Sequence, residues 1–366
     1  MRAGALVGLL GLAAASRVVA QGAPAAQDTK ATFTVGTATA KRGAVAYGDL
    51  VVPPNGDPGM AMPVAVIHGA MPGKVVAFIA GSHGTEYASI VALTRLITRV
   101  DPAKLSGTLI VMPLLNLASF EQMTPHINPV DRKGMNSNYP GNPAGTQSER
   151  ALDLVARNVV VPSDVIVDLH GGDLDEDLRP YSYWTRTGDA ALDAASHDLV
   201  LAFGLDHVIL RDVDAANPAG ARSLGGNALA RGKLSIVAEA GRSGLVLDND
   251  VNALINGCLN VLGSLRMIDR AVKPVSNPTY ITAGTRIAAD KAGMFYATVA
   301  RDTRVQKDQV VGYTTDYLGR KTGDVKAPVT GLVSFIRGVP SMAPGSTLVN
   351  VAEVLPSVPP YRKPAP

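Results

Sequence analysis

Residues 75–100 read VVAFIAGSHGTEYASIVALTRLITRV, and this stretch indicates the fold of the chain. Residues 75–81 form a short apolar run, which is typical of a strand buried on both faces. Residues 87–100 have helical periodicity, because Ile90, Leu93 and Ile97 fall on one face of a helix. A polar turn, SHGTE, lies between the two. The order of strand, turn and helix is the repeating unit of an α/β sheet.

The rest of the first 271 residues continues this alternation. Four more apolar segments have the length of buried strands: 108–115, 164–169, 207–210 and 234–238. Two more segments have helical periodicity: 146–160 and 248–268. We therefore expect an α/β domain over residues 41–271, with a mainly parallel central sheet flanked by helices.

The composition changes after residue 271. Residues 272–279, VKPVSNPT, have the prolines of a linker, and short β-rich segments separated by Gly and Asp follow. These features predict a linker and a small C-terminal all-β domain over 272–355. Residues 356–366 read as a Pro-rich tail.

The first 20 residues have the pattern of a secretory signal peptide. Arg2 precedes an apolar run at 3–15 that is too short to span a bilayer, and Ala20 ends a suitable cleavage site. The alternatives are an uncleaved anchor and an unstructured tail. We expect cleavage near Ala20, export to the periplasm or the medium, and a leader over residues 21–40.

Composition excludes several classes of protein. With 366 residues, 46% of them hydrophobic and 18% charged, the chain is globular and long enough for two domains. A net charge of +3 is too balanced for a nucleic-acid binder, and no segment after residue 20 is apolar enough to span a membrane. The single cysteine, Cys258, rules out an intrachain disulfide and a Cys-rich zinc module, so a metal would need His and carboxylate ligands. The oligomeric state is not indicated.

Three candidate metal ligands fall at the ends of two predicted strands. His83 and Glu86 lie in the turn after residues 75–81, with the spacing H-x-x-E, and His170 follows residues 164–169. Carboxyl ends of parallel strands meet at one edge of a sheet, which is where ligands bind. Two histidines and one glutamate with an open fourth position are a catalytic zinc arrangement. We predict one zinc ion per chain at these residues; the alternative is a set of hydrogen-bonded loop residues.

Glu239 repeats this placement, because it follows the predicted strand at 234–238. A carboxylate beside a catalytic metal takes a proton from water and delivers it to the leaving group, whereas the alternative role is an ion pair with Arg242. Asp168, two residues before His170, either orients that imidazole or is solvated. The other histidines have no partner at ligand spacing and are interpreted as structural: His68, His126, His197 and His207.

Five motifs together resemble the succinylglutamate desuccinylase/aspartoacylase family: GSHGTE at 81–86, NPVDRKGMNSNYPG at 128–141, GTQSERA at 145–151, DLHGGD at 168–173 and AEAG at 238–241. The resemblance extends over about residues 40–355. It implies a fold similar to that of the zinc carboxypeptidases and a zinc-dependent hydrolase that cleaves an amide bond. The implied zinc ligands are His83, Glu86 and His170, and the implied base is Glu239.

The substrate contacts depart from the family pattern. The family commonly has an Asn-Arg pair whose arginine binds a substrate carboxylate; here Asn136 is followed by Ser137, which lacks a guanidinium. The resemblance assigns Asn136 to substrate binding. It leaves Arg132 in the same loop either to bind the carboxylate or to polarise the scissile carbonyl. Arg179 and Tyr181 are further candidates for substrate binding; the alternative for each arginine is surface solubility.

These features predict a deacylase of a small N-acylated amino acid or a related amide, with a small molecule as its partner. One alternative is a zinc carboxypeptidase acting on peptides or cell-wall fragments. The serine at position 137 argues against an enzyme that requires a free C-terminal carboxylate. A second alternative is a zinc-bearing binding protein without catalysis, against which Glu239 argues, because a purely structural site needs no base.

Overall fold

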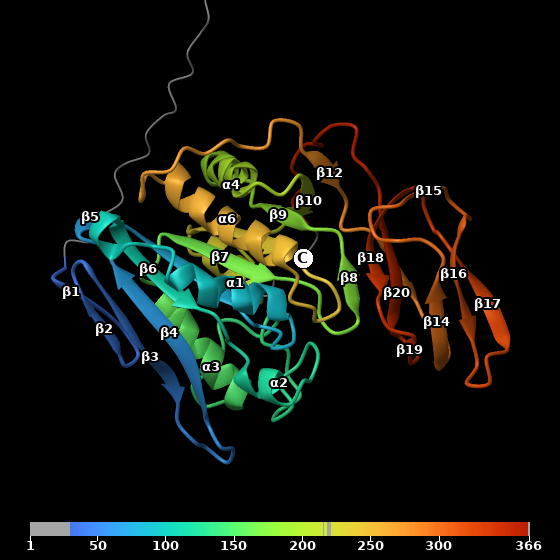
Figure 1. The fold of residues 1–366 in the computed structure, drawn as a ribbon, viewed down its shortest axis with the longest axis horizontal. Helices are drawn as coiled ribbons and strands as arrows, with labels where there is room; N and C mark the ends of the chain where they lie inside the picture. Colours follow the sequence, from blue (N-terminus) through green and yellow to red (C-terminus); the bar gives the residue numbers. More distant parts are fainter. Residues whose placement is uncertain (1–29, 215, 218–220, 365–366) are drawn as a thin grey trace, which may run out of the picture.

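The computed structural model describes residues 30–364 except 215 and 218–220 (Figure 1). The predicted signal peptide, 1–20, lies outside the described residues. Among the helices of the described part, none has the length and hydropathy needed to cross a membrane.

A large sheet forms the centre of the molecule, with its strands in the order β12-β10-β9-β11-β7-β5-β6-β4-β3 (Figure 1). Its strands are β3 (Ala44–Val52), β4 (Met60–His68), β5 (Met71–Ala80), β6 (Ser106–Met112), β7 (Val165–His170), β9 (Tyr181–Arg186), β10 (His207–Asp212), β11 (Leu234–Glu239) and β12 (Thr279–Ile281). All five strands that the sequence predicts belong to this sheet.

The sheet is mixed rather than uniformly parallel. Five of its eight neighbouring pairs are parallel, and these include the central run β6-β5-β7-β11. The antiparallel pairs are β3 with β4, β4 with β6, and β9 with β11. The sequence missed β9 because YSYWTR alternates aromatic and polar residues instead of forming a continuous apolar run.

Helices cover both faces of this sheet. They are α1 (Tyr87–Ile97), α2 (Leu117–Glu121), α3 (Gln147–Val155), α4 (Ala190–Phe203), α5 (Leu224–Leu229) and α6 (Asp248–Ser264), with a 3₁₀ turn at Pro102–Lys104 and a π-helical turn at Ala156–Val160. α1, α4 and α6 pack on one face, in the apolar cluster that contains Phe78 and Leu93. α3 and α5 pack on the other, in the cluster that contains Ile79 and Leu152. The class is therefore α/β, as predicted.

An N-terminal hairpin replaces part of the expected leader. β1 (Thr32–Val35) and β2 (Ala38–Lys41) pair in antiparallel fashion. Phe33 and Val35 from β1, and Ala38 and Ala40 from β2, are buried in the second apolar cluster. The expected leader boundary at residue 40 is therefore too late, because the alternating apolar residues of this hairpin complete the core.

Residues beyond β12 form two small antiparallel sheets beside the large one (Figure 1). Their strands are β13 (Thr285–Ala288), β14 (Gly293–Ala297), β15 (Arg304–Val305), β16 (Val310–Thr315), β17 (Lys321–Lys326), β18 (Gly331–Arg337), β19 (Ser341–Met342) and β20 (Thr347–Ala352). They enclose their own apolar cluster, which includes Phe295, Val311 and Val349. The expected all-β character of this segment agrees with these strands.

The two parts exchange strands at their boundary. β12, which the sequence placed in the linker and β-rich segment, pairs with β10 at the edge of the large sheet. In return, β8 (Glu176–Leu178) pairs with β18 of the C-terminal part. A boundary at residue 271 therefore does not separate the strands cleanly, because backbone pairing crosses it in both directions.

Candidate active site

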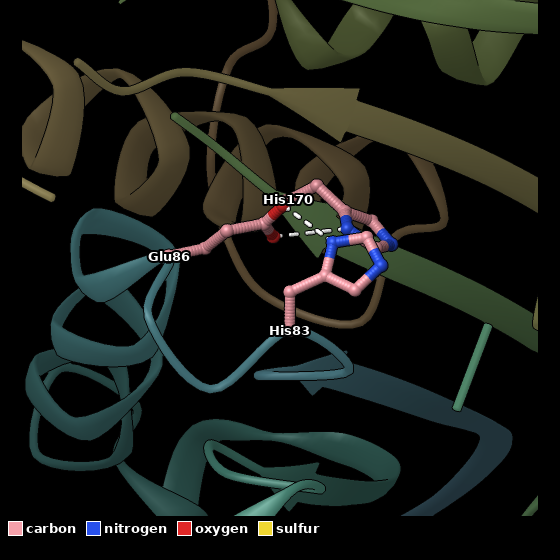
Figure 2. Close-up of side chains that lie close together, drawn as sticks. All are labelled: His83, Glu86 and His170. Carbon is pink, nitrogen blue, oxygen red and sulfur yellow. Dashed lines mark hydrogen bonds and ion pairs between the residues drawn. The ribbon is translucent and has the colours of Figure 1, made fainter. Parts of the chain in front are cut away.

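His83, Glu86 and His170 meet at the carboxyl ends of two neighbouring parallel strands. β5 and β7 pair in parallel, with Ala80 opposite Leu169, so the turn after β5 lies beside the last residue of β7. His83 Nδ1 lies 2.7 Å from Glu86 Oε1, and His170 Nδ1 lies 2.9 Å from Glu86 Oε2 (Figure 2). Each imidazole therefore contacts a different oxygen of the same carboxylate.

The chemistry of this donor set fits a divalent metal ion. One ligand atom from each of the three residues lies within 4.8 Å of the others. Glu86 is only 2% exposed. Burial raises the pKa of its carboxyl, but the imidazoles of His170 and His83 lower that pKa by more than burial raises it. The net pKa therefore lies well below the usual range. Two imidazole nitrogens and a carboxylate oxygen are ligands that Zn²⁺ accepts, and three protein ligands leave a position open.

Two polar side chains contact the ring nitrogen of His170 that faces away from Glu86. Its Nε2 lies 3.2 Å from Asp168 Oδ1 and 3.3 Å from Asn136 Nδ2. Asp168 is 1% exposed, so its carboxylate is not solvated. Although burial lowers the pKa of His170, Asp168 and Glu86 raise it well above its usual value. Asp168 is thus placed to orient this imidazole, which was one of the two roles considered for it.

Glu239 lies beside this cluster, at the end of β11. It is directly opposite His170 in the parallel ladder between β11 and β7. Burial and the nearby carboxylates raise the pKa of Glu239 to about 8. Its alternative partner, Arg242, instead lies 3.2 Å from Asp177. The geometry therefore places Glu239 as a carboxylate facing the cluster and not as half of an ion pair with Arg242.

Two cavities adjoin the cluster. The first lies against α5 and is lined by Asn136, Asp168, His170, Tyr183, Arg211 and Glu239, among others. The second reaches toward the C-terminal β-sheets and is lined by Glu86, Glu176, Tyr181, Arg286 and Asn350, among others. His83, Tyr183 and Glu239 line both cavities. A ligand can therefore extend to either side of the candidate metal site.

The predicted substrate-binding residues separate into two groups. Asn136 lines the first cavity, and Tyr181 lines the second. Arg179 lines neither cavity, because its guanidinium binds Asp206 at 2.7 Å and approaches Asp302 at 3.2 Å. Arg132 lines neither cavity and is exposed, with a backbone φ of 61°.

His126 has partners that its sequence spacing did not reveal. Its Nδ1 lies 3.0 Å from Asp173 Oδ2 and its Nε2 3.2 Å from Asp175 Oδ1, and its ring is 5.8 Å from that of His83. Burial lowers the pKa of His126, but Asp175, Asp173 and Glu176 together raise it to about 9. The acidic run at 173–176 was the available signal, but nothing in the sequence shows that residue 126 folds against it.

The remaining histidines make bonds elsewhere in the fold. Buried His68 bonds Thr108 at 2.8 Å, His197 bonds the Tyr280 hydroxyl at 2.6 Å, and His207 lies 2.9 Å from Asp206. Their interpretation as structural residues agrees with these contacts. The single cysteine, in α6, is fully buried.

Comparison with known proteins identifies the family. The model of the succinylglutamate desuccinylase/aspartoacylase catalytic domain matches residues 72–265. The chain belongs to this family. The resemblance carried by the five sequence motifs is thereby confirmed.

This chain matches its relatives over most of their length. The chain is 26% identical over 326 residues to the N-alpha-acetyl-L-2,4-diaminobutyric acid deacetylase of Halomonas elongata, a match that covers 86% of this chain and 93% of the relative. A succinylglutamate desuccinylase/aspartoacylase from Rhodobacter sphaeroides has a similar fold, with a TM-score of 0.75 at 23% identity over 86% of this chain and 96% of that one. The product-bound ectoine utilization protein of Ruegeria pomeroyi gives a TM-score of 0.76 at 22% identity, with the same coverage.

Proposed function

We propose that this protein is a zinc-dependent deacylase that hydrolyses the amide bond of a small N-acylated amino acid. The observation that carries the proposal is the meeting of His83, Glu86 and His170 at one sheet edge, with Glu239 beside them. The names of the relatives, a deacetylase of an N-acetylated diamino acid among them, support the amide as the bond that is cleaved.

The metal-binding part of the proposal assigns one zinc ion to His83 Nδ1, His170 Nδ1 and the carboxylate of Glu86. When bound, zinc supplies Lewis-acid chemistry that polarises a carbonyl and makes water more acidic. Asp168 fixes the orientation of the His170 ring, which keeps Nδ1 directed at Glu86.

The proton transfers belong to Glu239. Its carboxylate accepts a proton from the attacking water and then delivers it to the nitrogen of the leaving amine, so the amide carbon–nitrogen bond breaks with a neutral amine as the product. Because Glu239 lines both cavities, it faces a scissile amide whichever cavity holds the acyl group. Asn136 and Tyr181 contribute polar contacts from the two sides.

Arg179 and Arg132 are left out of this mechanism. Arg179 joins the large sheet to the C-terminal part through Asp206 and Asp302, so we propose that it is structural. The side chain of Arg132 belongs to the exposed surface of its loop.

The test is hydrolysis of a substrate panel by zinc-loaded, chelator-treated and zinc-restored protein. The panel contains Nα-acetyl and Nα-succinyl amino acids together with short peptides. We expect release of free amine from N-acyl amino acids, loss with the chelator and recovery with zinc. Cleavage of peptides alone would favour a carboxypeptidase, and full zinc occupancy without any hydrolysis would favour a binding protein.

Two further parts of the proposal concern the fold family and the location. We propose that the α/β part has a fold similar to that of the zinc carboxypeptidases, and that residues 1–20 export the chain. Fractionation of a bacterial host that expresses the full chain tests export. The expected product is a periplasmic or secreted protein that begins at Gln21 by mass spectrometry, whereas an intact N-terminus in the cytosolic fraction would contradict it.

A further inference from the structure

Three neighbouring strands present a row of side chains to the first cavity. In the ladder between β9 and β11, Tyr181 lies opposite Glu239 and Tyr183 opposite Val237. In the ladder between β9 and β10, Arg211 lies opposite Thr185. Residues that are paired across strands, or two apart along one strand, project to the same face. Arg211 therefore projects to the same side of the sheet as Glu239.

Arg211 is an exposed cation on this face. Among the described residues that line the first cavity, it is the sole Arg or Lys. The structure gives its guanidinium no ion pair within the described part of the chain. The adjacent carboxylate, Asp212, is already bound by Arg186 at 2.6 Å. A guanidinium without a protein partner in a ligand cavity is available to a ligand anion.

Charge is divided along the cavity. Asp168 and Glu239 lie at the end that borders His170, and Arg211 lies beyond β9. Along β9, the positions opposite Glu239 and Arg211 are four residues apart, which corresponds to about 13 Å of strand. Because β9 lies between them, the two residues are also separated across the sheet, and both side chains line the same cavity. Arg211 therefore attracts a ligand carboxylate to the end of the cavity that lies beyond β9.

We propose that Arg211 binds the carboxylate of the substrate and so sets the direction in which the amide enters the site. This inference rests on the proposed deacylase function. It supplies, from a strand that is distant in sequence, a carboxylate-binding guanidinium that Ser137 lacks. The carboxylate belongs either to the amino acid or to a dicarboxylic acyl group, and the two sources are separable by experiment.

The test compares substrates that differ only at the carboxylate. Wild-type protein, Arg211→Gln and Arg211→Lys are assayed with Nα-acetyl-L-2,4-diaminobutyrate and with its primary carboxamide. We expect Arg211→Gln to lower kcat/KM for the carboxylate by about 10–100-fold and to leave the carboxamide unchanged, because one charge-assisted contact is lost. Arg211→Lys should recover part of the loss. An equal loss on both substrates, or no loss on these two and none on the N-succinyl compound of the second pair, would overturn the inference while leaving deacylation intact.

A second pair of substrates locates the carboxylate. An N-succinyl derivative of the same carboxamide carries its carboxylate on the acyl group alone. Selective loss with this compound assigns the carboxylate to the acyl side, and selective loss with the acetyl compound assigns it to the amino acid; both outcomes support the role of Arg211. If wild-type protein hydrolyses none of these compounds or the wider panel, the proposed function fails and this inference fails with it.

Binding provides a readout that is independent of turnover. In zinc-loaded Glu239→Gln protein, calorimetry should show that adding Arg211→Gln weakens binding of the acetyl carboxylate by a similar factor and leaves carboxamide binding unchanged. Arg99→Gln is the matched control, since it removes the same charge from an exposed site near the far end of α1. Equal affinity with and without Arg211 for both the acetyl carboxylate and the N-succinyl carboxamide would reject the contact.

Discussion

Glu239 lies directly opposite His170 in the parallel ladder between β11 and β7. Residues in register on neighbouring strands project to the same face. The side chains of Glu239, the proposed base, and of His170, a proposed zinc ligand, therefore project from the same face of the sheet. A shift of one residue in either strand would turn one of the two side chains into the opposite face, where α1, α4 and α6 form an apolar core. Glu239 and His170 therefore reach the same site only in this strand register.

The first prediction concerns metal content. Purified protein should hold about one zinc ion per chain, and His83→Ala and His170→Ala should each lose most of it, since either change removes one of three ligands. Elemental analysis of dialysed protein gives the number. His197→Ala, which affects a histidine bonded to Tyr280, serves as the control and should retain zinc. Full occupancy in both site variants would eliminate this cluster as the metal site.

The second prediction concerns Glu239→Gln. Glutamine is nearly isosteric with glutamate but cannot accept and return a proton, so kcat should fall by about 10²–10⁴-fold while zinc content and melting temperature stay close to those of wild type. The assay is turnover of an N-acyl amino acid on the preparation used for metal analysis. Glu353→Gln, an exposed position, is the control. Unchanged turnover in folded, zinc-loaded Glu239→Gln would transfer the base to another carboxylate.

The third prediction concerns the close approach between the segment that follows β7 and the segment that follows β11. A Cβ atom added at Gly241 would collide with the backbone carbonyl of Gly171, directly after His170. Gly241→Ala should therefore destabilise the fold by about 1–3 kcal/mol and weaken zinc binding. Gly323→Ala, where the nearest atom is 3.8 Å away, should change neither property. Chemical unfolding and zinc titration measure the two effects, and a wild-type result for Gly241→Ala would show that the two segments separate without cost.

The fourth prediction concerns stability in acid. Arg150 binds Asp57 through both guanidinium nitrogens, at 2.7 and 3.1 Å, and this contact lowers the pKa of Asp57. A lowered folded-state pKa means that the stabilisation is complete above the ordinary Asp pKa, near 4, and is lost as the pH falls through the folded-state value. Asp57→Asn should cost about 1–3 kcal/mol at pH 7 and progressively less below pH 4.

Urea unfolding at several pH values measures this difference. Asp290→Asn, at an exposed position without an ion pair in the described part of the chain, is the control and should show no such dependence. A destabilisation by Asp57→Asn that is the same at pH 7 and at low pH would indicate that the ion pair with Arg150 is not its source.

The candidate ligands were predictable because each follows an apolar strand by a few residues. Ala80 and His170 end neighbouring parallel strands, and that arrangement follows from strand and helix alternation alone. The hairpin at 32–41 and strand β9 were not predictable in this way, because their short alternating patterns are shared by many surface segments. The exchange of β8 and β12 across the boundary depends on backbone pairing, which has no sequence signal of its own.

The sequence by itself determined the α/β class, the family and the four residues proposed for metal binding and proton transfer, because local periodicity and short motifs carry that information. Only the tertiary structure decided which charged side chains border the cavities. It pairs Arg179 with Asp206 and His126 with Asp173, and it brings Arg211 to the face of the sheet that carries Glu239. These placements depend on strand order and register between segments far apart in the chain, and spacing along the sequence does not encode such distances.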